Sequence, residues 1–152
     1  MKRRARIGAE LTDVARKIAT TRERQAAIET IRRRLDNRPE ILCAYLHGSF
    51  LTEGPYRDID VAVWIDPAPH SPGAVTRYML DLSTDLSVAL GQPVDVQVLN
   101  RAALPFRHHA LKGQPLVVRD WEWLDELRAR TWDDYADFLP FAHQNLRELL
   151  GA

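Results

Sequence analysis

The sequence contains one cysteine, Cys43, among its 152 residues, so no disulfide can form within the chain. No stretch approaches the roughly 20 consecutive apolar residues that a membrane-spanning helix needs. The beginning of the sequence is basic, from Lys2 to Arg6, but no continuous apolar segment follows, and a secretory signal is not expected. These absences together predict a cytoplasmic protein without a membrane segment.

Several familiar kinds of site are also missing. The sequence has no long glycine-rich phosphate loop, and no pattern of Ser, His and Asp or of Cys and His that indicates a nucleophilic enzyme. His108 and His109 are adjacent, so on a helix their side chains diverge by about 100° and do not share a metal easily. His47 and Cys43 lie too far apart on a strand for a closed zinc site. We expect structural roles for all four.

What is present is an ordinary globular composition, with 45% hydrophobic and 28% charged residues, no internal repeat and no obvious linker. This length suits one compact domain. The charges, however, are unevenly distributed. Residues 1–38 hold 12 Lys and Arg against 5 Asp and Glu, and residues 39–152 hold 9 against 16, so the two parts carry +7 and −7. We therefore distinguish a basic helical segment, 1–38, from the remainder, 39–152.

A basic segment can bind nucleic acid through the phosphate backbone. The alternatives are a solvated helix face or a docking surface for an acidic partner. No aromatic residue is interleaved among the arginines of residues 2–38, as a stacking platform for bases would require. The pattern therefore favours the alternatives over nucleic-acid binding.

Apolar residues recur at helical spacing in five regions. The first two regions are residues 5–19 and a second helix that ends before Pro39. Ser71-Pro72 resembles a helix start, and that helix is expected to stop at Gly91. A short helix is predicted over residues 103–111, and a helical pattern interrupted by Pro140 begins at Trp121.

Four segments read as strands: residues 41–46, 58–65, 93–99 and 116–118. The second alternates strictly, so its Ile and Val side chains face one way and Asp58, Asp60, Ala62 and Trp64 the other. The fourth is expected at a sheet edge. The order of elements predicts a small α/β domain, in the wider sense α+β, with a mixed sheet flanked by helices.

Acidic side chains fall on two of these strands. Asp58 and Asp60 are two residues apart and project from one face, and Asp95 lies near the start of the next strand. Close carboxylates repel one another, and a divalent cation removes that conflict. If the strands are adjacent, three carboxylates form an oxygen-rich site suited to Mg²⁺. Two such ions would clamp the attacking and leaving oxygens of a phosphoryl displacement.

Gly48-Ser49 directly follows the first strand. Glycine lets the backbone approach a phosphate closely, and the serine hydroxyl can donate to phosphate oxygens. A Gly-Ser pair alone is weak evidence, and so is an Asp-x-Asp on a strand. The prediction of a phosphate and metal site depends on the ordered combination of Gly48-Ser49, Asp58-x-Asp60 and Asp95.

The segments Leu46–Phe50, Asp58–Val63 and Pro93–Ala102 resemble the DNA polymerase β-type nucleotidyltransferases, and more narrowly their minimal members, the MNT group. The resemblance covers about residues 40–140 and implies a polymerase β-like fold, here with an extra N-terminal helix. It also implies that Asp58 and Asp60 bind both metals, that Asp95 binds the catalytic one, and that Gly48-Ser49 holds the triphosphate. Two features depart from the family: the loop of eight residues between Ser49 and Asp58 is short, and Arg57 stands where serine is common.

The resemblance implies a function as well. MNT proteins act as antitoxins beside HEPN ribonuclease toxins and transfer AMP from ATP to a tyrosine of the toxin. The chain has little length left after the catalytic core for a small-molecule acceptor pocket, so a protein acceptor is expected. The alternatives are an antitoxin that acts by binding alone and a nucleotidyltransferase with a small-molecule acceptor. Homo- and hetero-oligomers both fit the sequence.

Overall fold

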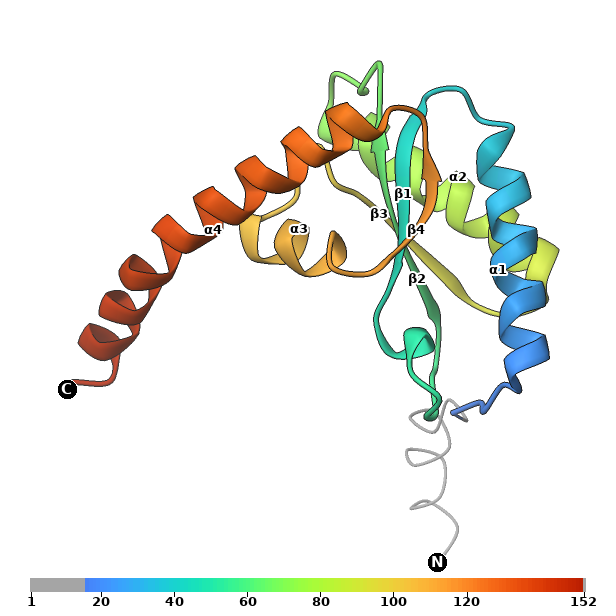
Figure 1. Cartoon of the computed structure of the whole chain (residues 1–152), viewed down its shortest axis with the longest axis horizontal. Helices are drawn as coiled ribbons and strands as arrows, with labels where there is room; N and C mark the ends of the chain where they lie inside the picture. Colours follow the sequence, from blue (N-terminus) through green and yellow to red (C-terminus); the bar gives the residue numbers. More distant parts are fainter. Residues whose placement is uncertain (1–15, 152) are drawn as a thin grey trace, which may run out of the picture.

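The structure is a computed structural model that describes residues 16–151, and its centre is a four-stranded mixed sheet (Figure 1). The strand order is β3-β2-β1-β4. β1 is antiparallel to both of its neighbours, and β2 is parallel to β3. The strands span Ile41–His47 (β1), Ile59–Ile65 (β2), Val94–Val98 (β3) and Gln114–Val118 (β4). The predicted α/β architecture, with a fourth strand at the edge, is confirmed.

Helices cover both faces of this sheet (Figure 1). On one face, α1 and α2 bury Ile31, Leu35, Leu82 and Leu86 against the strands. On the other face, α3 and the first half of α4 enclose a second apolar cluster around Tyr45. The helices span Thr21–Asp36 (α1), Pro72–Leu90 (α2), Leu104–Ala110 (α3) and Trp121–Leu149 (α4), and a 3-10 turn, η1, spans Ser49–Leu51.

The alternating pattern of β2 determines how the sheet is embedded. Ile59, Val61, Val63 and Ile65 pack into the cluster beneath α1 and α2. The intervening residues, Ala62 and Trp64, face α3 and α4. Since side chains two apart share a face, Asp60 belongs to the α3 side of the sheet. The sheet therefore has one fully apolar face and one face that is polar at its end.

Local signals set the limits of α2 as predicted. The Ser71 hydroxyl accepts a hydrogen bond from the Ala74 backbone N–H at 3.1 Å, and Pro72 opens the helix. Gly91 ends it in the left-handed conformation, with φ of 66°.

Two helix predictions need correction. Residues 5–15 of the predicted helix 5–19 lie outside the described part of the chain, but residues 16–19 are not helical. Lys17 instead exchanges two backbone hydrogen bonds with Tyr56, at 2.8 and 2.9 Å, and this pairing replaces the helix. The division into segments 1–38 and 39–152 stays a prediction.

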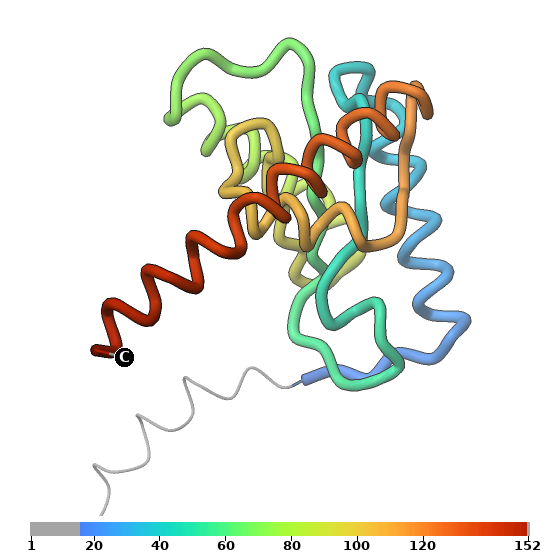
Figure 2. Tube along the Cα trace, turned by 60° about the vertical axis from the view of Figure 1, so that its left-hand side comes forward, coloured from blue at the N-terminus to red at the C-terminus, as the bar shows by residue number. Residues whose placement is uncertain are grey.

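The second correction concerns Pro140, which does not interrupt α4 (Figure 2). Proline removes one hydrogen bond to the carbonyl four residues earlier, that of Ala136. Both residues are exposed, so water can reach that carbonyl. α4 continues as one helix, and its C-terminal half extends past the sheet. Among residues 16–151, no helix combines the length and the apolarity needed to cross a bilayer.

Candidate active site

The pairing of β2 with β3 brings the predicted acidic residues together. Asp60 and Asp95 are direct partners in the parallel register, and Asp58 immediately precedes β2. Asp58 and Asp60 are half-buried, whereas Asp95 is exposed and accepts a hydrogen bond from the Gln97 amide at 3.3 Å. Three carboxylates therefore meet at one end of the sheet.

Asp60 responds most strongly to this arrangement. Burial, followed by the charges of Asp58 and Asp95, raises the pKa of Asp60 from 3.8 to about 6. Burial disfavours the charged form of the group, and two nearby anions disfavour it further. The site therefore has an excess of negative charge that a cation would relieve.

Gly48 lies directly against this carboxylate. Its φ is +81°, in the region that favours glycine, and a Cβ atom there would stand 2.3 Å from Asp60 Oδ2. No other residue fits without displacing Asp60. The Gly48-Ser49 turn and the carboxylates are thus parts of one site, with Ser49 exposed beside them.

His47 is a neighbour that sequence reasoning set aside. It pairs with Asp60 across β1 and β2 and is only 6% exposed. Its ring meets the edges of Phe106 and His109 of α3, with centroids 5.4 and 5.8 Å apart. Burial and the nearby His109 lower the pKa of His47, and Asp95 opposes that shift. The lowered pKa favours the neutral form of this imidazole, which lies next to Asp60 in the sheet.

The donor set suits a hard cation. No group of three His, Cys, Asp or Glu side chains within residues 16–151 converges closely enough to hold a metal ion by itself. Mg²⁺ rarely uses such a closed cage, because it keeps several waters and binds through one or two carboxylates together with substrate phosphates. Carboxylates whose mutual repulsion a cation would relieve fit that kind of open site.

A cavity of about 360 Å³ adjoins Asp58, one of the three carboxylates. Its wall includes Ser49, Asp58 and two arginines, one from each of two separate segments. The lining residues are Arg16, Ser49, Pro55, Tyr56, Arg57 and Asp58. The space beside Gly48-Ser49 is therefore both open and partly cationic.

A larger hollow of about 570 Å³ lies between α1 and α2, away from the carboxylates. Arginines line it, but Arg34 pairs with Asp85 at 2.9 Å, and Arg38 pairs with Asp85 and Glu40 at 3.7 and 3.8 Å. These pairs neutralise part of the basic charge of residues 1–38, which favours a solvated helix face over a nucleic-acid site.

Carboxylates at the end of a sheet, beside a Gly-Ser turn, suit metal-assisted phosphoryl or nucleotidyl transfer. The family model described as polymerase beta, nucleotidyltransferase, matches residues 29–122, more than half of the sequence, and the chain belongs to this family. No curated protein matches the chain significantly.

Solved structures of toxin–antitoxin complexes resemble the fold. One contains the tri-AMPylated Shewanella oneidensis HEPN toxin with an MNT antitoxin; it is 25% identical with a TM-score of 0.63, over 85% of this chain and 99% of that one. A toxin–antitoxin structure with AMP-PNP is 23% identical with a TM-score of 0.64, over 84% and 98% of the two chains. The MntA–HepT complex is 21% identical with a TM-score of 0.60, over 88% and 100%.

Sequence reasoning missed two contributions to this site. Arg57 is visible in the sequence as a departure from the family pattern, but its position in a cavity wall is not. Arg16 comes from a segment that was predicted to be helical, and no local signal places it near Ser49. The position of Arg16 becomes apparent only from the pairing of Lys17 with Tyr56.

Proposed function

We propose that this chain is the antitoxin of a HEPN/MNT pair and transfers AMP from ATP to a tyrosine of its HEPN toxin. The observation that carries the proposal is the register of Asp60 with Asp95 beside Gly48, within a chain of the nucleotidyltransferase family. The similarity to an MNT antitoxin in complex with a tri-AMPylated HEPN toxin supports this choice of acceptor. The AMP-PNP complex supports ATP as the nucleotide.

In this proposal Asp58, Asp60 and Asp95 are the catalytic residues and would hold Mg²⁺, with two ions as in other two-metal sites. The ions would neutralise the triphosphate and stabilise the charge that develops on the attacking and leaving oxygens. Gly48 leaves room for a phosphate, and the Ser49 hydroxyl donates to it.

The residues of the chain arrange an in-line displacement. The tyrosine oxygen of the acceptor bonds to the α-phosphorus, while the bond from that phosphorus to the oxygen bridging to the β-phosphate breaks, and pyrophosphate leaves. Asp95, the most exposed of the three carboxylates, accepts the tyrosine proton.

The test is to incubate the chain with ATP labelled at the α-phosphate, Mg²⁺ and the HEPN protein from the neighbouring reading frame. Label should appear on a toxin tyrosine by mass spectrometry. Asp60→Asn preserves shape but removes a charge, so the transfer rate should fall by at least about a thousandfold. Complex formation, measured by gel filtration, should persist because it does not depend on that carboxylate.

Asp81→Asn, an exposed change on α2, is the matched control and should transfer AMP normally. A wild-type chain that transfers no nucleotide, together with an Asp60→Asn variant that still neutralises the toxin fully, would show instead an antitoxin that acts by binding alone.

A further inference from the structure

The pairing of Lys17 with Tyr56 places two arginines side by side. Lys17 and Tyr56 exchange both backbone hydrogen bonds in an antiparallel bridge. In such a pair the preceding residue of one strand lies opposite the following residue of the other, so Arg16 stands opposite Arg57. Residues that stand opposite each other share a face. Both arginines line the cavity that contains Ser49 and Asp58.

The opposite face of the bridge is anchored in the core, which fixes the direction of the arginines. Tyr56 is 4% exposed, packs against Phe50 with ring centroids 4.8 Å apart, and donates its hydroxyl to the Gln92 amide oxygen at 2.7 Å. Since successive residues of an extended chain alternate, Arg57 must point away from the core and toward the cavity.

Arg24 of α1 holds the loop between Ser49 and Asp58 in place. Its guanidinium donates to the backbone carbonyls of Phe50 and Gly54, the latter at 3.2 Å, and lies 5.2 Å from the centre of the Phe50 ring. The short loop is therefore supported from outside, by the segment that precedes it in the sequence.

Arg16 and Arg57 have no acidic partner among the residues that the structure describes. Neither forms an ion pair with any of residues 16–151. Like charges placed directly opposite each other are destabilising. Guanidinium groups bind phosphate in a bidentate fashion, and a bound anion would remove their repulsion.

We propose that Arg16 and Arg57 bind the β- and γ-phosphates of the nucleoside triphosphate, the part that leaves as pyrophosphate. The inference rests on the proposed function and assigns positioning residues within it. Ser49 and Asp58 border the same cavity, so the triphosphate extends from the carboxylates toward the two arginines. Arg16 thus belongs to the nucleotide site.

The test compares ligands with and without these two phosphates. Binding to the full chain is measured by isothermal titration calorimetry in the presence of Mg²⁺. AMP-PNP and inorganic pyrophosphate should bind about tenfold more weakly to Arg57→Gln and to Arg16→Gln, because each loses a charged hydrogen bond to phosphate. AMP, which lacks the two phosphates, should bind all variants equally. Arg57→Lys should retain part of the affinity. Arg77→Gln, an exposed change on α2, is the control and should bind like wild type.

Three results would overturn the inference. The first is equal AMP-PNP affinity for the wild type and the Arg16→Gln/Arg57→Gln double variant. The others are an equal loss of affinity for AMP and AMP-PNP in the variants, and a wild-type chain that binds neither AMP-PNP nor pyrophosphate. A failure of this inference can be distinguished from a failure of the proposed function. Selective loss of AMP-PNP binding in a chain that modifies no toxin refutes the function alone. Normal AMP-PNP binding by a double variant of a chain that does modify its toxin refutes this inference alone.

Discussion

The Asp60 side chain is constrained both by the charges of its neighbours and by the close approach of Gly48. It lies against Gly48, pairs in register with Asp95, and is half-buried between two other carboxylates. Because the pKa of Asp60 is raised from 3.8 to about 6, the folded chain retains a proton on this carboxyl in that pH interval, whereas the unfolded chain has lost it. The carboxylate therefore opposes folding once it is ionised, unless a cation is present.

This gives a prediction about pH. The pKa of Asp60 rises from 3.8 to about 6 on folding, so its contribution to the free energy of unfolding falls as pH rises through that interval and stays low above it. Asp60→Asn is neutral at every pH. Without divalent cations, it should unfold at a higher temperature than wild type at about pH 8 and at a similar temperature at about pH 4.

Differential scanning fluorimetry measures this difference, and Mg²⁺ should reduce it at the higher pH by stabilising wild type. The exposed carboxylate of Asp81 serves as control, since Asp81→Asn should shift the unfolding temperature little at either pH. An Asp60→Asn variant less stable than wild type at the higher pH would contradict the account.

Gly48 permits a second prediction at the same scale. Gly48→Ala places a Cβ atom 2.3 Å from Asp60 Oδ2 at a φ of +81°, and we expect it to lower the free energy of unfolding by about 1–3 kcal/mol. Gly73→Ala on α2 is the control, because its Cβ would meet nothing within 4 Å and alanine favours helices. Urea unfolding of both variants checks the contrast, and equal effects would refute it.

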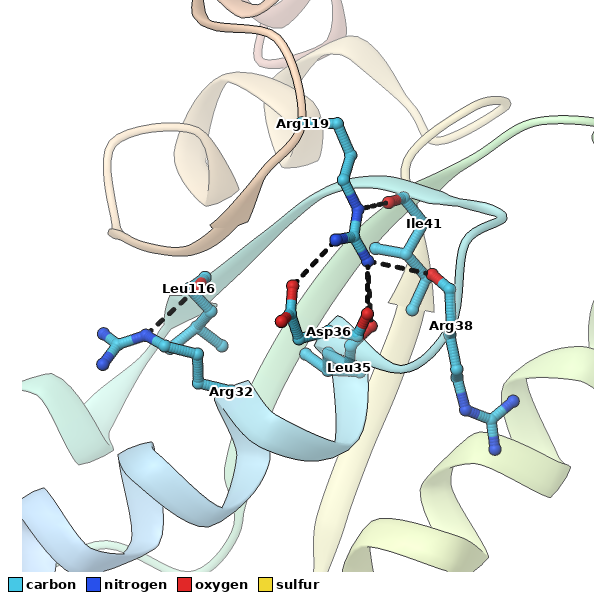
Figure 3. Close-up of polar contacts among 7 residues, drawn as sticks. All are labelled: Arg32, Leu35, Asp36, Arg38, Ile41, Leu116 and Arg119. Carbon is cyan, nitrogen blue, oxygen red and sulfur yellow. Dashed lines mark hydrogen bonds and ion pairs between the residues drawn. The ribbon is translucent and has the colours of Figure 1, made fainter.

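At the scale of elements, Arg119 connects three parts of the fold (Figure 3). It follows β4 and donates to the Ile41 carbonyl at the start of β1, at 3.1 Å. It also donates to the carbonyls of Asp36 and Arg38 at 2.8 and 3.2 Å, and pairs with the Asp36 carboxylate at 2.7 Å. One guanidinium thus satisfies the carbonyls where α1 ends and joins them to the sheet.

Arg119→Lys should therefore be costly, although it keeps the charge. Lysine presents a compact ammonium that cannot reach these acceptors together. We expect a loss of about 1–3 kcal/mol in the free energy of unfolding, measured in guanidinium chloride.

Arg32→Lys is the matched control in the same region. Arg32 makes a single hydrogen bond to a backbone carbonyl, that of Leu116 at 3.2 Å (Figure 3). It also forms an exposed ion pair with Glu29. Its replacement should cost distinctly less, and a comparable loss in both variants would show that the network does not act as a unit.

At the scale of the whole molecule, α4 has two different halves (Figures 1 and 2). Its first half buries Leu124 and Leu127 against the sheet. Its second half extends beyond the sheet, and no residue from 141 to 151 is buried. The folding energy of α4 therefore comes from its first half.

Truncation after Pro140 should accordingly leave the free energy of unfolding within about 1 kcal/mol of wild type, since exposed positions contribute little. Circular dichroism during chemical unfolding measures this, and AMP-PNP binding should be unchanged. Truncation after Leu124 is the contrasting case, because it removes buried Leu127 and should destabilise the fold severely. A large loss of stability on truncation after Pro140 would show instead that the second half of α4 contacts the domain.

Local chemistry in the sequence determined most elements of this protein. The alternation in β2, the Ser71-Pro72 start and the Gly91 end of α2 depend on neighbouring residues alone, so they could be predicted without the fold. The resemblance to the nucleotidyltransferases, carried by short motifs, predicted Gly48, Ser49, Asp58, Asp60 and Asp95 as one site. Their roles belong to the proposal, but their proximity is a property of the structure.

Only the tertiary structure decided which distant segments meet. The register of Asp60 with Asp95 required β2 and β3 to pair in parallel, which strand patterns alone do not establish. Residues 16–19 carry a helical pattern, yet backbone pairing of Lys17 with Tyr56 outweighs it, because local propensity is weak beside long-range hydrogen bonding and packing. That pairing, between residues far apart in the sequence, places Arg16 beside Arg57 in the wall of one cavity.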